Sequence, residues 1–179
     1  VKLLLSVEAD VNVSDKKGFN ALHLAAQCGS AAAIQALLDA GSNVDAVDRS
    51  DCTALHMAVN HGHVESAGVL IKSGAHIDRV DMHGATALIR CIKQAPLNAS
   101  QGHMTVLQTL LSAGANVNTS YMQGTTGLHI AAQKGHKKMI EALVQHGADR
   151  TVKDDKGETA WDIAKRHRMV GMRELLECI

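Results

Sequence analysis

The chain has 179 residues, of which 46% are hydrophobic and 20% are charged, and its 18 lysines and arginines balance 18 acidic residues. This length suits a single domain and the composition excludes a disordered chain, while zero net charge leaves no strong field to attract nucleic acid or an anionic membrane. The single phenylalanine, tyrosine and tryptophan offer too few rings to stack on single-stranded bases, and no apolar run approaches the roughly 20 residues that span a bilayer.

A repeat organises the chain. Its copies open on a turn of the form Asp-x-x-Gly-x-Thr-x-Leu-His or a close variant, and they start 33 residues apart except after the third, which is longer. Self-similarity at such a period is typical of solenoid proteins. The expected organisation is a single domain over 1–179, made of a partial repeat followed by five copies: 1–14, 15–47, 48–80, 81–120, 121–153 and 154–179.

The first 14 residues match the second half of a repeat. Residues 1–5 have the apolar pattern of a second helix, and residues 9–12 match the loop that follows it. An apolar half-repeat has no partner on its outer side and makes a poor end to a stack. We therefore expect the chain to be a fragment of a longer protein, or to lack an upstream half-repeat.

Each complete copy is expected to form two short helices. In the first copy, apolar residues three and four positions apart predict one helix over 21–28 and another over 32–38. A residue with a capping side chain precedes the first helix of each copy: Asn20, Thr53, Thr86, Thr126 and Thr159. A glycine, suited to the left-handed residue that ends a helix, follows the second helix of the first four copies: Gly41, Gly74, Gly114 and Gly147.

Helices of about nine residues cannot bury their apolar faces alone, so the copies must stack on one another. The combination of turn, cap, helices, glycine and period resembles the ankyrin-repeat family over essentially the whole chain. The resemblance implies an all-α solenoid of stacked helix-turn-helix units with projecting β-turn fingers. Where the family has Thr-Pro-Leu-His, this chain has Thr-Ala-Leu-His or Thr-Gly-Leu-His, and so lacks the proline that pre-organises the first helical turn.

The third and last copies depart from the pattern. The third contains seven extra residues, 95–101, in which Pro96 prevents a simple continuation of the first helix. Two interpretations are open: a tolerated surface loop, since loop length costs little entropy, or a partner-specific lip midway along the binding groove. The last copy is expected to cap the stack, because residues 165–168 make its surface polar and Trp161 replaces the motif leucine as a large core residue.

The histidines do not predict a catalytic, cofactor or metal site. The resemblance implies that His23, His56 and His129 hydrogen-bond within and between repeats. His61 and His63 have the spacing of a chelating pair, but the sequence places no third ligand beside them. Without a nucleophile motif, a phosphate loop or an expected enclosed pocket, the chain is predicted not to be an enzyme.

The cysteines bear on the compartment. The four of them include no C-x-x-C pair, and no signal peptide is visible. This pattern favours reduced thiols and an intracellular location, in the cytoplasm, the nucleus or both.

The resemblance also implies that a partner is bound by the finger tips and by the first helix of each copy, which forms a concave wall. The finger candidates are Lys16, Lys17, Phe19, Arg49, Ser50, Cys52, Met82, His83, Tyr121, Met122 and Gln123. The groove candidates are Gln27, Asn60, His61, Lys93, Gln94, Gln133 and Lys134. Phe19 is expected to be an exposed anchor, whereas Tyr121, which takes the place of the turn aspartate, could instead pack locally.

The leading functional hypothesis is a non-catalytic protein–protein interaction module with a partner that the sequence does not identify. One alternative is a domain that senses a nucleotide or nucleic acid, supported only by the basic C-terminal end. Another is a regulatory ankyrin domain of a larger enzyme. Residues 1–90 carry a net charge of −3 and residues 91–179 a net charge of +3, an asymmetry that either orients a protein partner along the solenoid or arises by chance.

Overall fold

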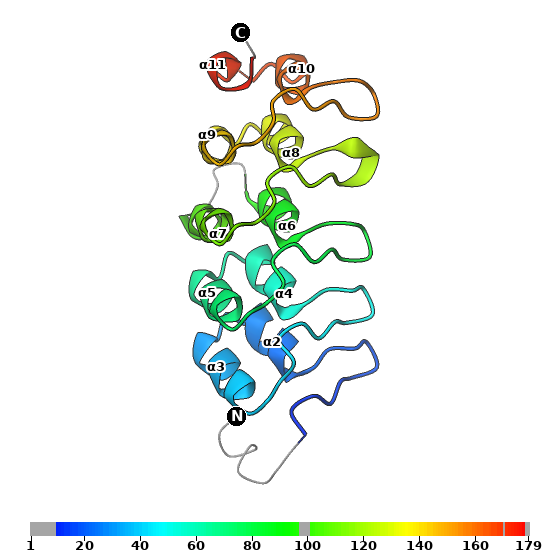
Figure 1. Cartoon of the computed structure of the whole chain (residues 1–179), viewed down its shortest axis with the longest axis vertical. Coiled ribbons are helices and arrows are strands. Elements are labelled where there is room, and N and C mark those ends of the chain that lie inside the picture. The colour runs from blue at the N-terminus through cyan, green and yellow to red at the C-terminus, as the bar shows by residue number, and fades with distance from the viewer. Residues whose placement is uncertain (1–9, 97–100, 170, 178–179) are drawn as a thin grey trace.

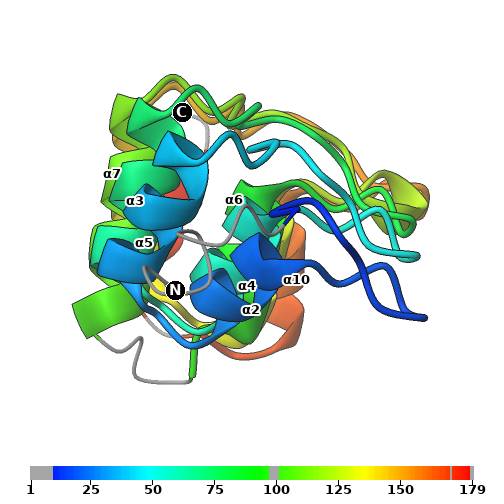
Figure 2. The ribbon, with the colours of Figure 1, turned by 90° about the horizontal axis from the view of Figure 1, so that it is seen from below.

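The computed structural model describes residues 10–96, 101–169 and 171–177. In these ranges the repeats stack into a column with two layers of helices, and hairpin fingers project from one side (Figure 1). The view along the column shows the fingers leaving the inner layer, with the outer layer on the far side (Figure 2). This is the all-α repeat solenoid that the sequence predicts. The helix expected over residues 1–5 lies outside the described residues.

The helices of the two layers alternate along the chain. The inner helices are α2 (Ala21–Gln27), α4 (Ala54–Asn60), α6 (Ala87–Gln94), α8 (Gly127–Lys134) and α10 (Ala160–Arg166). The outer helices are α3 (Ala31–Asp39), α5 (Val64–Lys72), α7 (Gln101–Ser112), α9 (Lys137–Gln145) and α11 (Arg173–Leu176). One turn of 3₁₀ helix, η1 (Met122–Gly124), lies in the fourth finger. None of the helices in the described part of the chain has the length and hydropathy needed to cross a membrane.

The helix ends lie where the sequence predicts them. Every predicted capping residue stands at the N-cap of an inner helix. The predicted glycines after the outer helices have φ angles between 84° and 87°, which glycine adopts without a steric penalty. At the end of α3, the amide of Gly41 donates to the carbonyl of Leu38 and that of Ser42 donates to the carbonyl of Leu37, both at 3.0 Å. These bonds satisfy carbonyl groups that the helix itself leaves free.

The core runs along the column between the two layers. The motif leucines of the inner helices are each 1% exposed: Leu22, Leu55, Leu88 and Leu128. The outer helices contribute fully buried side chains to the same core, among them Ile34, Leu70, Leu107 and Ile140. Trp161, which replaces the motif leucine in the last copy, is partly buried and packs against this core. The apolar faces of each copy are therefore covered by its neighbours.

Buried histidines link successive copies, as the family resemblance implies. The Nε2 atom of His23 donates to the carbonyl of Cys52 at 3.0 Å, and those of His56 and His129 donate to the carbonyls of Ala85 and Glu158 at 3.2 Å. Each bond crosses from one copy to the next. The third copy has no such bond, because it carries an isoleucine, Ile89, at this position.

Two further histidines lie at or near the start of outer helices, His63 at the N-cap of α5 and His103 in the first turn of α7, and their bonds reach back to the preceding copy. His63 donates from Nε2 to the carbonyl of Gln27 at 3.1 Å, and His103 donates to the carbonyl of Asn60 at 3.3 Å. Both bonds reach the end of the inner helix in the preceding copy, so they tie the two layers as well as the copies together.

The insertion of the third copy is described only at its edges. Ala95 is the C-cap of α6, and its amide donates to the carbonyl of Cys91 at 3.1 Å, while Pro96 is exposed. Residues 97–100 lie outside the described ranges. The last inserted residue, Gln101, already belongs to α7, which has 12 residues where α3, α5 and α9 have 9. The extra residues therefore lengthen the outer helix as well as the loop.

Candidate functional site

Four of the five fingers are held by an aspartate at their base. In the first finger, Oδ1 of Asp15 accepts the amides of Lys17 at 2.7 Å and Phe19 at 2.9 Å. The same two bonds, at 2.7 to 2.9 Å, form at Asp48, Asp81 and Asp154. A tip whose amides are bound in this way keeps its backbone fixed and directs its side chains outward.

Most predicted partner-binding residues lie at the surface. The exposed ones are Lys16, Lys17, Gln27, Arg49, His61, Met82, His83, Gln94, Met122, Gln123 and Gln133. The half-buried ones are Phe19, Ser50, Asn60, Lys93, Tyr121 and Lys134. Two of the exposed residues, Met82 and Met122, are large apolar side chains at neighbouring finger tips, 59% and 50% exposed.

Two of the sequence predictions need correction. Cys52 is 2% exposed and lies beneath the second finger, because the chain turns inward there to cap α4. Phe19 is not freely exposed: it packs against the core, and its ring centroid lies 5.7 Å from that of His23. Both residues follow the finger tip, where the chain is already returning toward the inner helix.

The fourth finger is built differently, because Tyr121 stands where the others have aspartate. No carboxylate is available to accept the tip amides, and the tip forms the 3₁₀ turn η1 instead. Gln123 adopts a φ of 60°, and the hydroxyl of Thr125 donates to the carbonyl of Met122 at 2.9 Å. The sequence change thus alters both the backbone of the finger and its charge.

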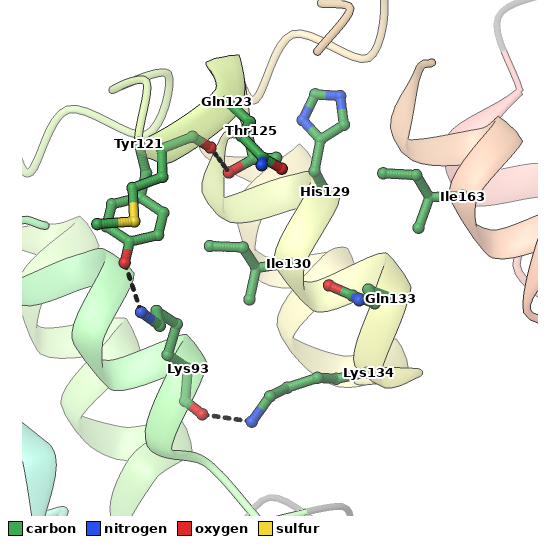
Figure 3. A pocket seen from close by; sticks show the side chains of 10 residues that line it. Lys93, Tyr121, Gln123, Thr125, His129, Ile130, Gln133, Lys134 and Ile163 are labelled. Atoms are coloured by element: carbon green, nitrogen blue, oxygen red, sulfur yellow. Dashed lines mark hydrogen bonds between the residues drawn. The ribbon is translucent and has the colours of Figure 1, made fainter. Parts of the chain in front are cut away.

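A pocket of about 390 Å³ opens beside this finger (Figure 3). Its walls come from the end of α6, the fourth finger, α8 and one residue of α10. The lining residues are Lys93, Tyr121, Met122, Gln123, Thr125, His129, Ile130, Gln133, Lys134 and Ile163. The pocket therefore brings together six of the predicted partner-binding residues, from both the finger set and the groove set.

Two lysines give the pocket its charge (Figure 3). Lys93 donates from Nζ to the hydroxyl of Tyr121 at 2.7 Å, and the same ammonium lies 4.4 Å from the centre of the tyrosine ring. Lys134 donates from Nζ to the carbonyl of Lys93 and, at 3.3 Å, to that of Ala95. Burial lowers the pKa of Lys134, and the nearby charge of Lys93 lowers it further. The lining residues include no aspartate or glutamate.

The apolar side of the pocket was not among the residues predicted from the sequence. Ile130 and Ile163, which are 9% and 5% exposed, face it from α8 and α10. Both residues hold the same place in their copies, four residues after the N-cap, and in the first copy Leu24 at this place is 53% exposed. The recurrence of apolar residues at this position is a signal that the sequence does contain.

In the third copy, the position four residues after the N-cap is occupied by Arg90. Arg90, Asp81 and Cys52 form a cluster in which the positive and the negative charge balance, called the neutral cluster below. The guanidinium of Arg90 lies 2.5 Å from Oδ2 of the buried Asp81 and also donates to Sγ of Cys52 at 2.9 Å. Burial alone would raise the pKa of Asp81, but the amides of Ala85 and His83 and the charge of Arg90 outweigh it and lower the pKa. The guanidinium of Arg90 is therefore paired with a carboxylate of the protein itself, whereas no acidic residue lines the pocket beside Lys93 and Lys134.

Of the three described cysteines, Cys52 and Cys91 are buried and Cys28 is exposed. Burial raises the pKa of Cys52 to about 11 and that of Cys91 to about 12, so both thiols stay protonated at neutral pH. The rings of His61 and His63 stack 5.6 Å apart. In the ranges that the structure describes, no three histidine, cysteine or acidic side chains gather as metal ligands would.

Comparison with known proteins agrees with this architecture. The family model described as ankyrin repeats (3 copies) matches residues 1–81, 47–118 and 95–178. The chain is 35% identical over 171 residues to the B-cell lymphoma 3 protein homolog of Mus musculus, a match that covers 95% of this chain and 38% of that protein.

Other relatives match over shorter segments. The identity is 35% over 86 residues with the ankyrin repeat and KH domain-containing protein mask-1 of Caenorhabditis elegans, and this segment is 47% of the chain and 3% of that protein. It is 38% over 86 residues with the ARF GTPase-activating protein GIT1 of Homo sapiens, covering 48% of the chain and 11% of that protein. The chain thus spans less than two fifths of the length of each of these relatives.

Proposed function

The chain belongs to the ankyrin-repeat family, whose repeats are generally protein–protein interaction modules, and from this premise we propose that it is a non-catalytic module that binds a partner protein. The contact surface in this proposal consists of the finger tips and the concave wall of inner helices. A role inside a longer enzyme is compatible with the same surface.

The observation that carries the proposal is a set of exposed apolar side chains on two finger tips and one inner helix. Met82 and Met122 stand on finger tips and Leu24 stands on α2, and each is at least 50% exposed. Large apolar side chains that face water at fixed positions favour contact with another molecule, and methionine adapts to varied partner shapes. An interface of ordinary size would bury about 800 Å² on this chain.

The three described cysteines agree with the intracellular location that we also propose. Cys28, Cys52 and Cys91 are all free thiols, as expected in a reducing compartment.

The proposal is tested by capture from cell lysate, followed by binding measurements with the purified partner. We expect the double variant Met82→Ala, Met122→Ala to lose partners that the unaltered protein retains, and to bind the purified partner at least about fivefold more weakly, or about 1 kcal/mol. Its thermal midpoint should stay unchanged, because both side chains are exposed.

Lys138→Ala on α9 is the matched control, since this exposed residue lies on the outer layer. Equal capture by the double variant and the unaltered protein would contradict the proposed surface. Phe19→Ala makes a poor probe of binding, because this half-buried ring packs against the core and its loss should lower stability.

A further inference from the structure

We propose that the pocket beside the fourth finger binds the carboxylate of an aspartate or glutamate that lies next to an apolar residue in a partner protein. This inference rests on the proposed function and specifies the chemistry of the partner segment. Four observations carry it: the charge of the pocket, the residue at the base of the finger, the hydrogen bonds of the two lysines, and the apolar wall.

The first observation is unbalanced charge. Two ammonium groups face the pocket, and none of its lining residues is acidic. Elsewhere on the inner helices, Arg90 pairs with Asp81 and Arg166 pairs with Glu158 at 2.9 Å. Among the described residues, Lys93 and Lys134 form no such ion pair. A carboxylate from outside the chain would supply the missing partner for both.

The second observation is that the fourth finger has a tyrosine where the other fingers have an aspartate. Asp81 in the third finger neutralises the cation of its own copy, and Tyr121 occupies the corresponding position of the fourth finger. The tyrosine keeps a polar group near the cation, since its hydroxyl accepts a hydrogen bond from Lys93. Because the tyrosine carries no negative charge, it does not neutralise the two lysines, and their positive charge can attract an anionic ligand.

The third observation is that both lysines are already held in place. Lys93 uses one of its three N–H groups on Tyr121, and Lys134 uses two on carbonyl oxygens. Within the described ranges three N–H groups of the two lysines have no acceptor, which suits the two oxygens of a carboxylate. A phosphate carries one more terminal oxygen and a larger charge. Because the lysines are ordered beforehand, binding costs less side-chain entropy.

The fourth observation is the apolar wall around the charge. Met122 of the finger, Ile130 of α8 and Ile163 of α10 line the pocket, and Figure 3 shows the two isoleucines on α8 and α10. A volume of about 390 Å³ accommodates an acidic side chain together with part of an apolar neighbour. The site is therefore suited to a segment in which acidic and apolar residues adjoin, more than to a free anion.

The test uses three fluorescein-labelled decapeptides and fluorescence anisotropy. In the first peptide leucine and glutamate alternate, in the second glutamine replaces glutamate, and in the third phosphoserine replaces it. We expect the glutamate peptide to bind at least about tenfold more tightly than either of the others. Failure of the glutamate peptide to bind at millimolar concentration, equal binding of the glutamine peptide, or tightest binding of the phosphoserine peptide would each overturn the proposal.

Variants locate the binding. Lys93→Gln should weaken binding of the glutamate peptide by about tenfold or more, and Tyr121→Asp should do the same by placing a carboxylate beside Lys93. Lys138→Gln removes the same charge from the exposed side of α9 and should change binding less than about twofold. Equal effects of Lys93→Gln and Lys138→Gln would mean attraction by overall charge and would overturn the site. Circular dichroism of each variant checks that it is folded.

The outcomes also separate this inference from the proposed function. If capture of a partner requires Met82 and Met122 but tolerates Lys93→Gln, the interaction module stands and the carboxylate site is wrong. If neither set of variants affects capture, the proposed binding surface itself is wrong.

Discussion

The junction between the third and fourth copies differs from the other junctions of the stack. At the first, second and fourth junctions, a buried histidine donates to a carbonyl of the next copy. At the same junctions a finger amide donates to the preceding finger: Arg49 to Lys17, Met82 to Ser50 and Asp155 to Gln123, at 2.9 to 3.0 Å. Between the third and fourth fingers, the described residues form neither bond.

At the junction between the third and fourth copies, called the exceptional junction below, two lysine side chains make the connections instead. Lys93 of the third copy reaches the hydroxyl of Tyr121 in the fourth, and Lys134 reaches back to carbonyl groups at the end of α6. The regular junctions use histidine rings and backbone amides whose hydrogen bonds form inside the protein, whereas this one uses ammonium groups that, among the described residues, leave N–H groups without an acceptor beside a pocket. The difference shows how one junction can remain part of the stack and still place two cationic side chains beside a pocket.

The largest expected effect comes from breaking the neutral cluster of the third finger. Asp81→Ala should lower the free energy of unfolding by about 4 kcal/mol, because it leaves Arg90 without its buried counter-charge and two tip amides without an acceptor. Urea denaturation followed by circular dichroism measures this change.

Asp15→Ala is the control, because Asp15 accepts the same two amides in an exposed finger. It should cost only about 1 kcal/mol. Similar losses for the two variants would show that the ion pair with Arg90 adds nothing to the stability of the fold, and that Asp81 does not differ from the other finger aspartates.

A smaller effect is expected when the pH is lowered, through the buried histidine of a regular junction. Burial, and after it the charge of Arg90, lowers the pKa of His56 from 6.5 to about 4. The neutral ring suits its site, since the amide and hydroxyl of Thr53 both donate to Nδ1 while Nε2 donates to Ala85. Between these two pKa values the unfolded chain takes up a proton more readily than the folded one, so stability falls as the pH falls.

Urea denaturation at several pH values should show a loss of about 2 kcal/mol from His56 between pH 7 and pH 5. His56→Gln removes the titrating group and should reduce this loss, whatever it does to stability at neutral pH. An undiminished pH dependence in that variant would show that other groups cause it. Asp81 does not interfere, because its pKa lies below 3.8 and its contribution is lost only in stronger acid.

The smallest effect is expected at the exceptional junction itself. Tyr121→Phe removes one half-buried hydrogen bond to Lys93 and keeps the ring beneath the ammonium. It should lower the free energy of unfolding by less than about 1 kcal/mol. A loss as large as that of Asp81→Ala would mean that the junction depends on this bond for folding, and that its lysines are not held chiefly for binding.

Some features of the molecule were predictable because they recur and depend on near neighbours in the chain. The N-cap Thr86, the end of α3 at Gly41 and the buried Leu55 each follow from a local pattern present in every copy or nearly so. The burial of Cys52 and the packing of Phe19 were predicted wrongly, since position along a finger says little about where the chain turns back toward the helices.

The sequence by itself determined the repeat, its helices and their apolar faces, because periodic spacing and capping residues act over a few positions of the chain. Only the tertiary structure decided that Lys93, Tyr121 and Lys134 meet, since they come from α6, a finger and the end of α8. Their meeting depends on how two copies stack across a junction without the usual histidine. That these lysines meet without an acidic side chain of the described residues beside them is a property of the arrangement in space, and no single segment encodes it.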